Sequence, residues 1–157
     1  MPRFLPPVSE ARAAGCELCE QAGGVLVFQA AHWRVIRAED ADFPAFYRVV
    51  WRAHAAEWTD LALTEQAVMM GVVDAVERVL RADLAPTKIN LASLGNVVAH
   101  LHWHVIARFD WDSRFPAPVW AEARRAVEPA PVARLALSLD ELDARVARAV
   151  AALAPAA

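Results

Sequence analysis

The sequence has few of the features of secreted or membrane-spanning proteins. Only two cysteines occur in 157 residues, Cys16 and Cys19, and they lie too close together to cross-link a secreted framework. No window approaches the ~18 uncharged apolar residues of a membrane helix. The N-terminal stretch also lacks the apolar segment of a signal peptide. We therefore expect no membrane association and a reducing, cytoplasmic location.

Charge of one sign is also scarce. The net charge is −3 and no block of Lys or Arg occurs, which argues against a nucleic-acid polymer as partner. A hydrophobic fraction of 57% and a charged fraction of 22% are typical of a globular protein. Without an internal repeat or a break in composition, the chain is expected to form one domain.

The N-terminal part of the chain predicts an irregular arm followed by short strands. Residues 1–15 contain Pro2, Pro6 and Pro7 and no periodic apolar pattern, so we expect no regular structure there. Short runs rich in β-branched and aromatic residues then alternate with turns. They predict an antiparallel meander of three strands, at 25–28, 33–36 and 47–51.

Two later segments have the period of an amphipathic helix. From Thr64 to about residues 83–86, one apolar stripe is formed by Val68, Val72, Val76 and Val79 or Leu80. Near the C-terminus, Ser138 and Glu141 form a capping-box pattern ahead of Leu142, Val146, Val150 and Leu153. A central helix and a C-terminal helix are therefore expected.

Alternating apolar and polar residues return at 88–91 and 100–107, separated by the turn-like residues Ser93 to Asn96. This arrangement predicts a hairpin. Together the segments predict an α+β fold: an antiparallel sheet of about five strands with a central helix and a C-terminal helix.

Three of the five histidines fall at alternate positions, His100, His102 and His104. In a strand, alternate side chains share one face, so the three imidazoles are expected to point one way. Burying three imidazoles without partners would be costly. A solvated face, a metal-binding patch and a structural metal site are alternatives. The preceding Gly95 and Asn96 favour an anion site, because a backbone N–H and an amide can bind phosphate.

The segment HLHWHVI resembles the histidine-triad (HIT) family pattern at every position, and it is most similar to bacterial members with the phrase LASLGNVVxHLHWHV. The resemblance covers residues 16–120, so we predict a HIT domain there and an extension with a helix over 121–157. It implies a homodimer that acts on a nucleotide. It also implies that His102 attacks the α-phosphorus and forms a nucleotidyl-histidine, while His104 contacts phosphate and leaving-group oxygens.

The resemblance assigns further substrate contacts. Asn90 and Asn96 match polar positions near the substrate phosphates, with Gly95 beside them. Asp40 is the nearest candidate for the ribose hydroxyls, and Glu39 and Asp42 compete with it. Trp120 is expected near a nucleotide or a dimer interface.

The sequence also departs from the family pattern at two positions. Ala99 replaces a frequent proline. Val97 stands where many relatives carry a Ser or Thr that donates to phosphate, so lower activity or a different substrate is expected.

The spacing of Cys16 and Cys19 fits half of a zinc site, a redox pair or two buried small residues. The resemblance to zinc-containing HIT proteins implies that His54 and His100 complete a structural Cys₂His₂ site. Zinc would not be required for the chemistry.

The leading hypothesis is a nucleotide hydrolase or nucleotidyl transferase acting on a dinucleoside polyphosphate, a nucleoside phosphoramidate or an adenylylated metabolite. One alternative is a nucleotide-binding regulatory module with little turnover. The other is a metal-dependent hydrolase that uses the three histidines as ligands, which would need a nearby carboxylate.

Overall fold

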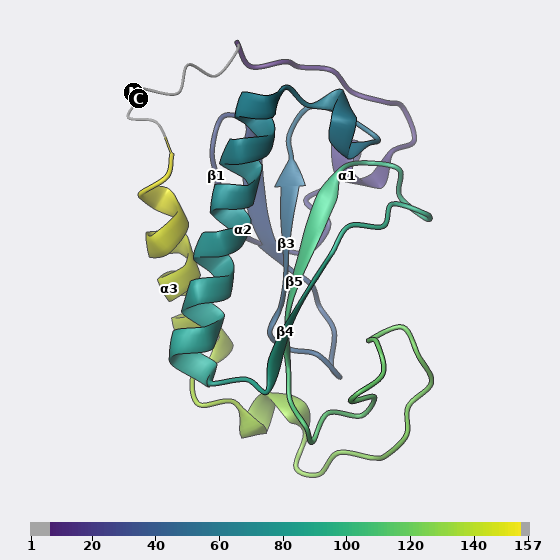
Figure 1. The fold of residues 1–157 in the computed structure, drawn as a ribbon, viewed down its shortest axis with the longest axis vertical. Coiled ribbons are helices and arrows are strands. Elements are labelled where there is room, and N and C mark those ends of the chain that lie inside the picture. Colours follow the sequence, from purple (N-terminus) through teal and green to yellow (C-terminus); the bar gives the residue numbers. More distant parts are fainter. Residues whose placement is uncertain (1–6, 155–157) are drawn as a thin grey trace.

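The structure is a computed structural model that describes residues 7–154, and a five-stranded antiparallel sheet forms its centre (Figure 1). The strand order is β1-β2-β3-β5-β4. The strands are β1 (Val25–Gln29), β2 (Trp33–Arg37), β3 (Phe46–Trp51), β4 (Lys88–Ala92) and β5 (His102–Arg108). This confirms the predicted α+β class, the meander and the β4–β5 hairpin.

Two helices cover one face of the sheet. The central helix α2 (Leu63–Leu84) buries Val72, Val76 and Leu80 from the predicted stripe, together with Met69 and Val73. The C-terminal helix α3 (Leu139–Ala151) begins after Ser138, whose hydroxyl accepts a hydrogen bond from the Glu141 amide as the capping box predicts. It packs beside α2 in Figure 1 and buries Leu142, Val146 and Val150. Leu153 lies beyond the helix and is exposed.

Alternation along the strands divides the sheet into two faces. Tyr47, Val49, Trp51 and Val105 belong to the core beneath α2 and α3. A second link to α3 is polar, since Asp143 accepts hydrogen bonds from the Tyr47 hydroxyl at 2.6 Å and from Arg37 Nε at 3.0 Å. The intervening side chains of β3 and β5 point to the opposite face, where the candidate site lies.

A one-turn helix, α1 (Glu17–Glu20), packs on this opposite face through Leu18, which contacts the cluster of Ile36 and Val50. The buried Arg34 of β2 holds the end of this helix, because its NH2 group donates to the carbonyls of Leu18 and Gln21. The helix follows Cys16 and contains Cys19. Its position therefore brings the cysteine pair close to the sheet.

The structure corrects the expected bounds at several places. Strand β5 begins at His102, so His100 lies before the strand and the argument from alternation does not apply to it. The sequence did not predict α1 or the 3-10 helices at Trp58–Asp60 and Pro131–Arg134. Residues 7–15 of the expected arm contain no helix or strand, and residues 1–6 lie outside the described residues.

Within residues 7–154, no helix combines the length and the apolar character needed to cross a membrane.

Candidate active site and metal site

His102 is the first residue of β5, and its orientation is set by its own backbone neighbourhood. Its Nδ1 atom lies 2.6 Å from the carbonyl oxygen of His100. A carbonyl can only accept a hydrogen bond, so Nδ1 carries the proton and donates. The lone pair of His102 is therefore on Nε2, the ring atom available to attack an electrophile.

His104 follows on the same face of β5, and its ring centroid lies 4.8 Å from that of His102. The rings of Phe46 and Trp120 flank it, with centroids at 5.2 and 5.6 Å. Its Nδ1 is buried and has no hydrogen-bond partner among the described residues. Three imidazoles on one face were expected. His102 and His104 share the face, whereas His100 precedes β5 and its ring contacts the cysteine pair instead.

Burial decides the charge of these imidazoles. It lowers the pKa of both His100 and His102 below the usual range of histidine. For His104, burial, the nearby His102 and the Arg48 guanidinium lower the pKa to about 3. All three rings are consequently neutral at pH 7. His104 can therefore act as a neutral hydrogen-bond donor and not as a cation.

A cavity of about 580 Å³ opens beside the two imidazoles. Its lining includes His102, His104, Gly95, Asn96 and Trp120, so the structure brings together most of the predicted site residues. Gly95 adopts a positive φ of 76°, the left-handed conformation that glycine tolerates best, and the loop turns there toward the cavity.

Three apolar side chains from the same loop, Leu94, Val97 and Val98, also line the cavity. Leu94 is half exposed, and Val97 is 98% exposed, so it offers no contact that replaces a hydroxyl.

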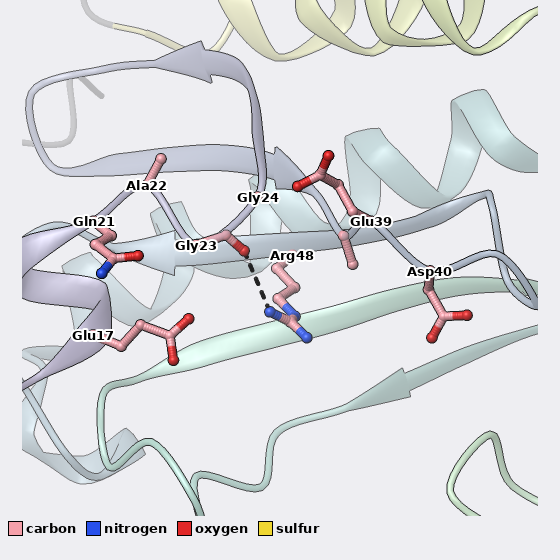
Figure 2. Close-up of a pocket in the computed structure, with 9 residues that line it drawn as sticks. Glu17, Gln21, Ala22, Gly23, Gly24, Glu39, Asp40 and Arg48 are labelled. Atoms are coloured by element: carbon pink, nitrogen blue, oxygen red, sulfur yellow. Dashed lines mark hydrogen bonds between the residues drawn. The ribbon is translucent and has the colours of Figure 1, made fainter.

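Asp40 lies in a neighbouring cavity of about 500 Å³ (Figure 2). Carboxylates from Glu17, Glu39 and Asp40 surround it, and Glu17 and Arg48 line both cavities. Asp40 already accepts hydrogen bonds from the backbone amides of Asp42 and Phe43 through Oδ1. The predicted ribose contact is thus separated from the imidazoles by Arg48.

Asn90 is not among the lining residues of either cavity. It lies on β4 opposite Ile106, and its Oδ1 accepts a hydrogen bond from Arg108 at 2.7 Å. Arg108 is buried and forms an ion pair with Asp112, which also accepts backbone hydrogen bonds from the loop after β5. In the free structure the Asn90 amide therefore supports this loop, which leads to Trp120.

The cysteine pair meets two histidines in a separate cluster. Ligand atoms of Cys16, Cys19, His54 and His100 all lie within 4.8 Å of one another. His100 Nδ1 is 3.5 Å from Cys16 Sγ and 3.4 Å from Cys19 Sγ, and His54 Nδ1 is 3.4 Å from Cys19 Sγ. Both cysteines are free thiols.

The geometry of this cluster fits a tetrahedral metal ion. Zinc bonds of ~2.3 Å to sulfur and ~2.0 Å to nitrogen place tetrahedral S and N ligands about 3.5 Å apart. His100 donates from Nε2 to the Trp51 carbonyl at 2.6 Å, which leaves the Nδ1 lone pair facing both thiols. A carbonyl that orients a ligating imidazole in this way is typical of metal sites. The quartet inferred from the resemblance therefore can hold a metal.

Sequence reasoning overlooked Arg48, which lines both cavities. The available signal was a single charged residue inside the otherwise apolar strand FYRVVW. Its significance depends on the pairing of β3 with β5, which places Arg48 opposite His104. It also overlooked Glu17 and Leu18, because α1 contacts the site only through the tertiary fold.

Comparisons with known proteins identify the family and agree with the fold. The HIT domain family model matches residues 20–111, and the chain belongs to the HIT family. A histidine triad protein from Bradyrhizobium japonicum is similar, with 28% identity, a TM-score of 0.67 and coverage of 82% of this chain and 92% of its own. A HIT protein from Sinorhizobium meliloti also has 28% identity, with a TM-score of 0.64 and coverage of 81% and 90%.

A more distant structure shares the fold. A hypothetical histidine triad nucleotide-binding protein from Sulfolobus tokodaii has 16% identity and a TM-score of 0.59, covering 88% of this chain and 93% of its own. No match was found among curated proteins.

Proposed function

We propose that this protein is a nucleotide hydrolase or nucleotidyl transferase that acts at the α-phosphate through a nucleotidyl-histidine on His102. The observation that carries the proposal is the hydrogen bond from His102 Nδ1 to the His100 carbonyl, which leaves Nε2 as a nucleophile at the cavity. Such an arrangement of a nucleophile and an orienting group is typical of covalent catalysis.

In the first step, Nε2 of His102 forms a bond to the α-phosphorus while the bond from phosphorus to the leaving group breaks. The leaving group departs with the electron pair of the broken bond and takes a proton from solvent, while the neutral His104 donates a hydrogen bond to the atom on which negative charge develops. The positive charge that develops on the His102 ring is stabilised by the His100 carbonyl, which accepts a hydrogen bond from its Nδ1–H group. Water or another acceptor then attacks the phosphorus and loses its proton to solvent, while the bond between phosphorus and Nε2 breaks and Nε2 regains its lone pair.

The residues that line the two cavities, which share Glu17 and Arg48, support a nucleotide as the substrate. Imidazoles and the Gly95–Asn96 backbone line one cavity, whereas carboxylates line the other. Carboxylates can accept hydrogen bonds from ribose hydroxyls, so we assign that role to Asp40 or Glu39. Trp120 is 56% exposed at the cavity and offers a ring for contact with a base or leaving group. A similar protein from Sulfolobus tokodaii is named nucleotide-binding.

The direct test is to trap the intermediate. The protein is mixed with an adenosine phosphoramidate or a dinucleoside polyphosphate, quenched rapidly and measured by intact-mass spectrometry. We expect an adenylyl adduct on His102 that is absent in His102→Gly. An adduct on another residue, or turnover with no adduct at any quench time, would overturn the proposed intermediate.

A nucleotide-binding module with little turnover is the second candidate, favoured by the exposed Val97 at a position where the family pattern often has a hydroxyl. It predicts measurable AMP binding and no adduct. The metal-dependent alternative is disfavoured, because the metal-like cluster found among residues 7–154 contains His100 but neither His102 nor His104.

Zinc in the Cys16, Cys19, His54 and His100 cluster is part of the proposal, with a structural role. It would connect α1 to the segment before β5. The free thiols of the pair fit the proposed reducing, cytoplasmic location.

A homodimer is also proposed. Strand β4 lies at the edge of the sheet and carries the exposed Leu91, so its unpaired edge and this apolar side chain could contact a second copy of the chain. Light scattering coupled to gel filtration measures the assembly, and a monomer at all concentrations would contradict it.

A further inference from the structure

Arg48 occupies the boundary between the two cavities. It lies on β3 directly opposite His104 in the sheet register, and it lines both cavities. Figure 2 shows its guanidinium pointing between Glu17 and Asp40. The aromatic ring of Phe46 lies 5.3 Å from its guanidinium carbon and holds the side chain in place.

The guanidinium has few partners for a half-buried charge. Its NH1 group donates one long hydrogen bond, of 3.5 Å, to the Gly23 carbonyl. Its Nε is buried without a partner, and Arg48 forms no ion pair within the part of the chain that the structure describes. A guanidinium has five donors and is costly to desolvate without acceptors. An anionic ligand would supply them.

Arg48 is also the lone cationic side chain among the described lining residues of both cavities. Val97 supplies no hydroxyl to the site. The carboxylates on the other side repel phosphate. A nucleotide with its sugar among these carboxylates and its phosphorus at His102 must place its α-phosphate next to Arg48.

We propose that Arg48 binds a non-bridging oxygen of the substrate's α-phosphate and thereby selects nucleotides over nucleosides. The inference rests on the proposed function and extends it. In this arrangement Arg48, on strand β3, neutralises the negative charge of the phosphate. The loop contributes no hydroxyl to the phosphate at position 97, where the residue is a valine. The remaining phosphates or other leaving group would extend away from the carboxylates, toward Gly95 and Trp120.

The test compares the binding of AMP and adenosine by calorimetry. Arg48→Met removes the charge, Arg48→Lys retains it without the planar donor set, and Arg52→Met removes an exposed arginine that donates to the Ala31 carbonyl outside both cavities. We expect Arg48→Met to weaken AMP binding about 10- to 100-fold, as for loss of a charge-assisted hydrogen bond. Adenosine binding should be unchanged, Arg48→Lys intermediate and Arg52→Met like wild type.

Circular dichroism and thermal unfolding establish that each variant is folded. If Arg48→Met does not fold, the AMP and adenosine affinities of Arg48→Lys provide the test. Unchanged AMP affinity in folded Arg48→Met would overturn the proposal. An equal loss of AMP and adenosine binding would also overturn it, because Arg48 would then shape the nucleoside cavity instead of binding phosphate.

The outcome is separable from the proposed function. If wild type forms no nucleotidyl adduct but loses AMP affinity upon Arg48→Met, the covalent mechanism fails and the phosphate contact stands. If the adduct forms in wild type and AMP affinity is unaffected in Arg48→Met, the mechanism stands and the role of Arg48 fails.

Discussion

His100 and His102 are two residues apart, yet the structure gives them opposite tautomers and different surroundings. His100 donates from Nε2 to the Trp51 carbonyl and directs Nδ1 at two thiols. His102 donates from Nδ1 to the His100 carbonyl and leaves Nε2 free at the cavity. The position of one carbonyl oxygen relative to each ring therefore determines which nitrogen is available for a ligand.

The comparison also shows how the two sites are connected. The backbone carbonyl of His100 accepts a hydrogen bond from His102 Nδ1, while the side chain of His100 belongs to the Cys16, Cys19, His54 and His100 cluster. A ring fixed at His100 thus helps to fix the carbonyl that orients His102. A metal ion bound by Cys16, Cys19, His54 and His100 would therefore help to position His102, in addition to connecting α1 to the segment before β5.

The largest expected effect comes from removing the nucleophile. His102→Gly should lower kcat by more than ~10³-fold, since loss of a covalent nucleophile raises the barrier by several kcal/mol. Metal content and AMP binding should remain close to wild type. Steady-state kinetics and metal analysis measure these, with His32→Gln as a control outside both sites. Retention of more than about a tenth of kcat would refute the role of His102.

The second effect concerns the cluster around His100. Tag-free protein should contain about one zinc per chain, and Cys19→Ser should abolish binding. Loss of a structural metal belongs to the mutations that cost more than about 4 kcal/mol, so the Tm should fall by about 10 °C or more. Metal analysis and calorimetry test both. Wild type purified without chelators and free of metal would leave the cysteines as packing residues.

The third prediction concerns the role of His104 beside the nucleophile. His104→Ala should reduce kcat about tenfold more with a poor leaving group than with a nitrophenyl ester, because a hydrogen bond to the leaving atom matters most when that atom carries negative charge poorly. Kinetics with both substrates and the Tm separate this from a packing role. Equal losses on both would remove leaving-group assistance and leave a phosphate contact.

The smallest effect is the pH dependence of stability. Burial, His102 and Arg48 hold the pKa of His104 at about 3 in the folded state, whereas the unfolded side chain titrates near its usual ~6.5. Between these values the unfolded chain binds one more proton, so His104 destabilises the fold as pH falls below ~6.5.

Replacing His104 with Gln should therefore flatten the fall of unfolding free energy with acid, by at most about 1.4 kcal/mol per pH unit. Urea unfolding of wild type and His104→Gln from pH 7 to 4 measures the difference. Parallel curves would mean that the ring keeps its usual pKa in the folded protein.

Much of the fold was accessible from local patterns. The stripe of Val72, Val76 and Leu80 predicts α2, and Ser138 with Glu141 predicts the start of α3, because helix periodicity and capping involve residues only a few positions apart. The one-turn α1 was missed. It has no apolar period of its own and is held by Arg34 from a different element.

In the candidate site, too, some features could be predicted from local sequence and others could not. Alternation by itself placed His102 and His104 on one face, and the motif resemblance identified the family and its expected nucleophile. The substrate contact of Asn90 stays a prediction, because in the structure its amide oxygen accepts a hydrogen bond from Arg108 and the residue lines a further cavity with Trp120.

The sequence by itself thus determined the strands, the two long helices and the shared face of His102 and His104, since each depends on neighbours along the chain. The tertiary structure alone decided that Arg48 lies opposite His104 and that Cys19 meets His54 and His100. It also decided the tautomers of His100 and His102. These features depend on strand register and on contacts between residues far apart in the chain, which packing of the whole sheet fixes and no local pattern encodes.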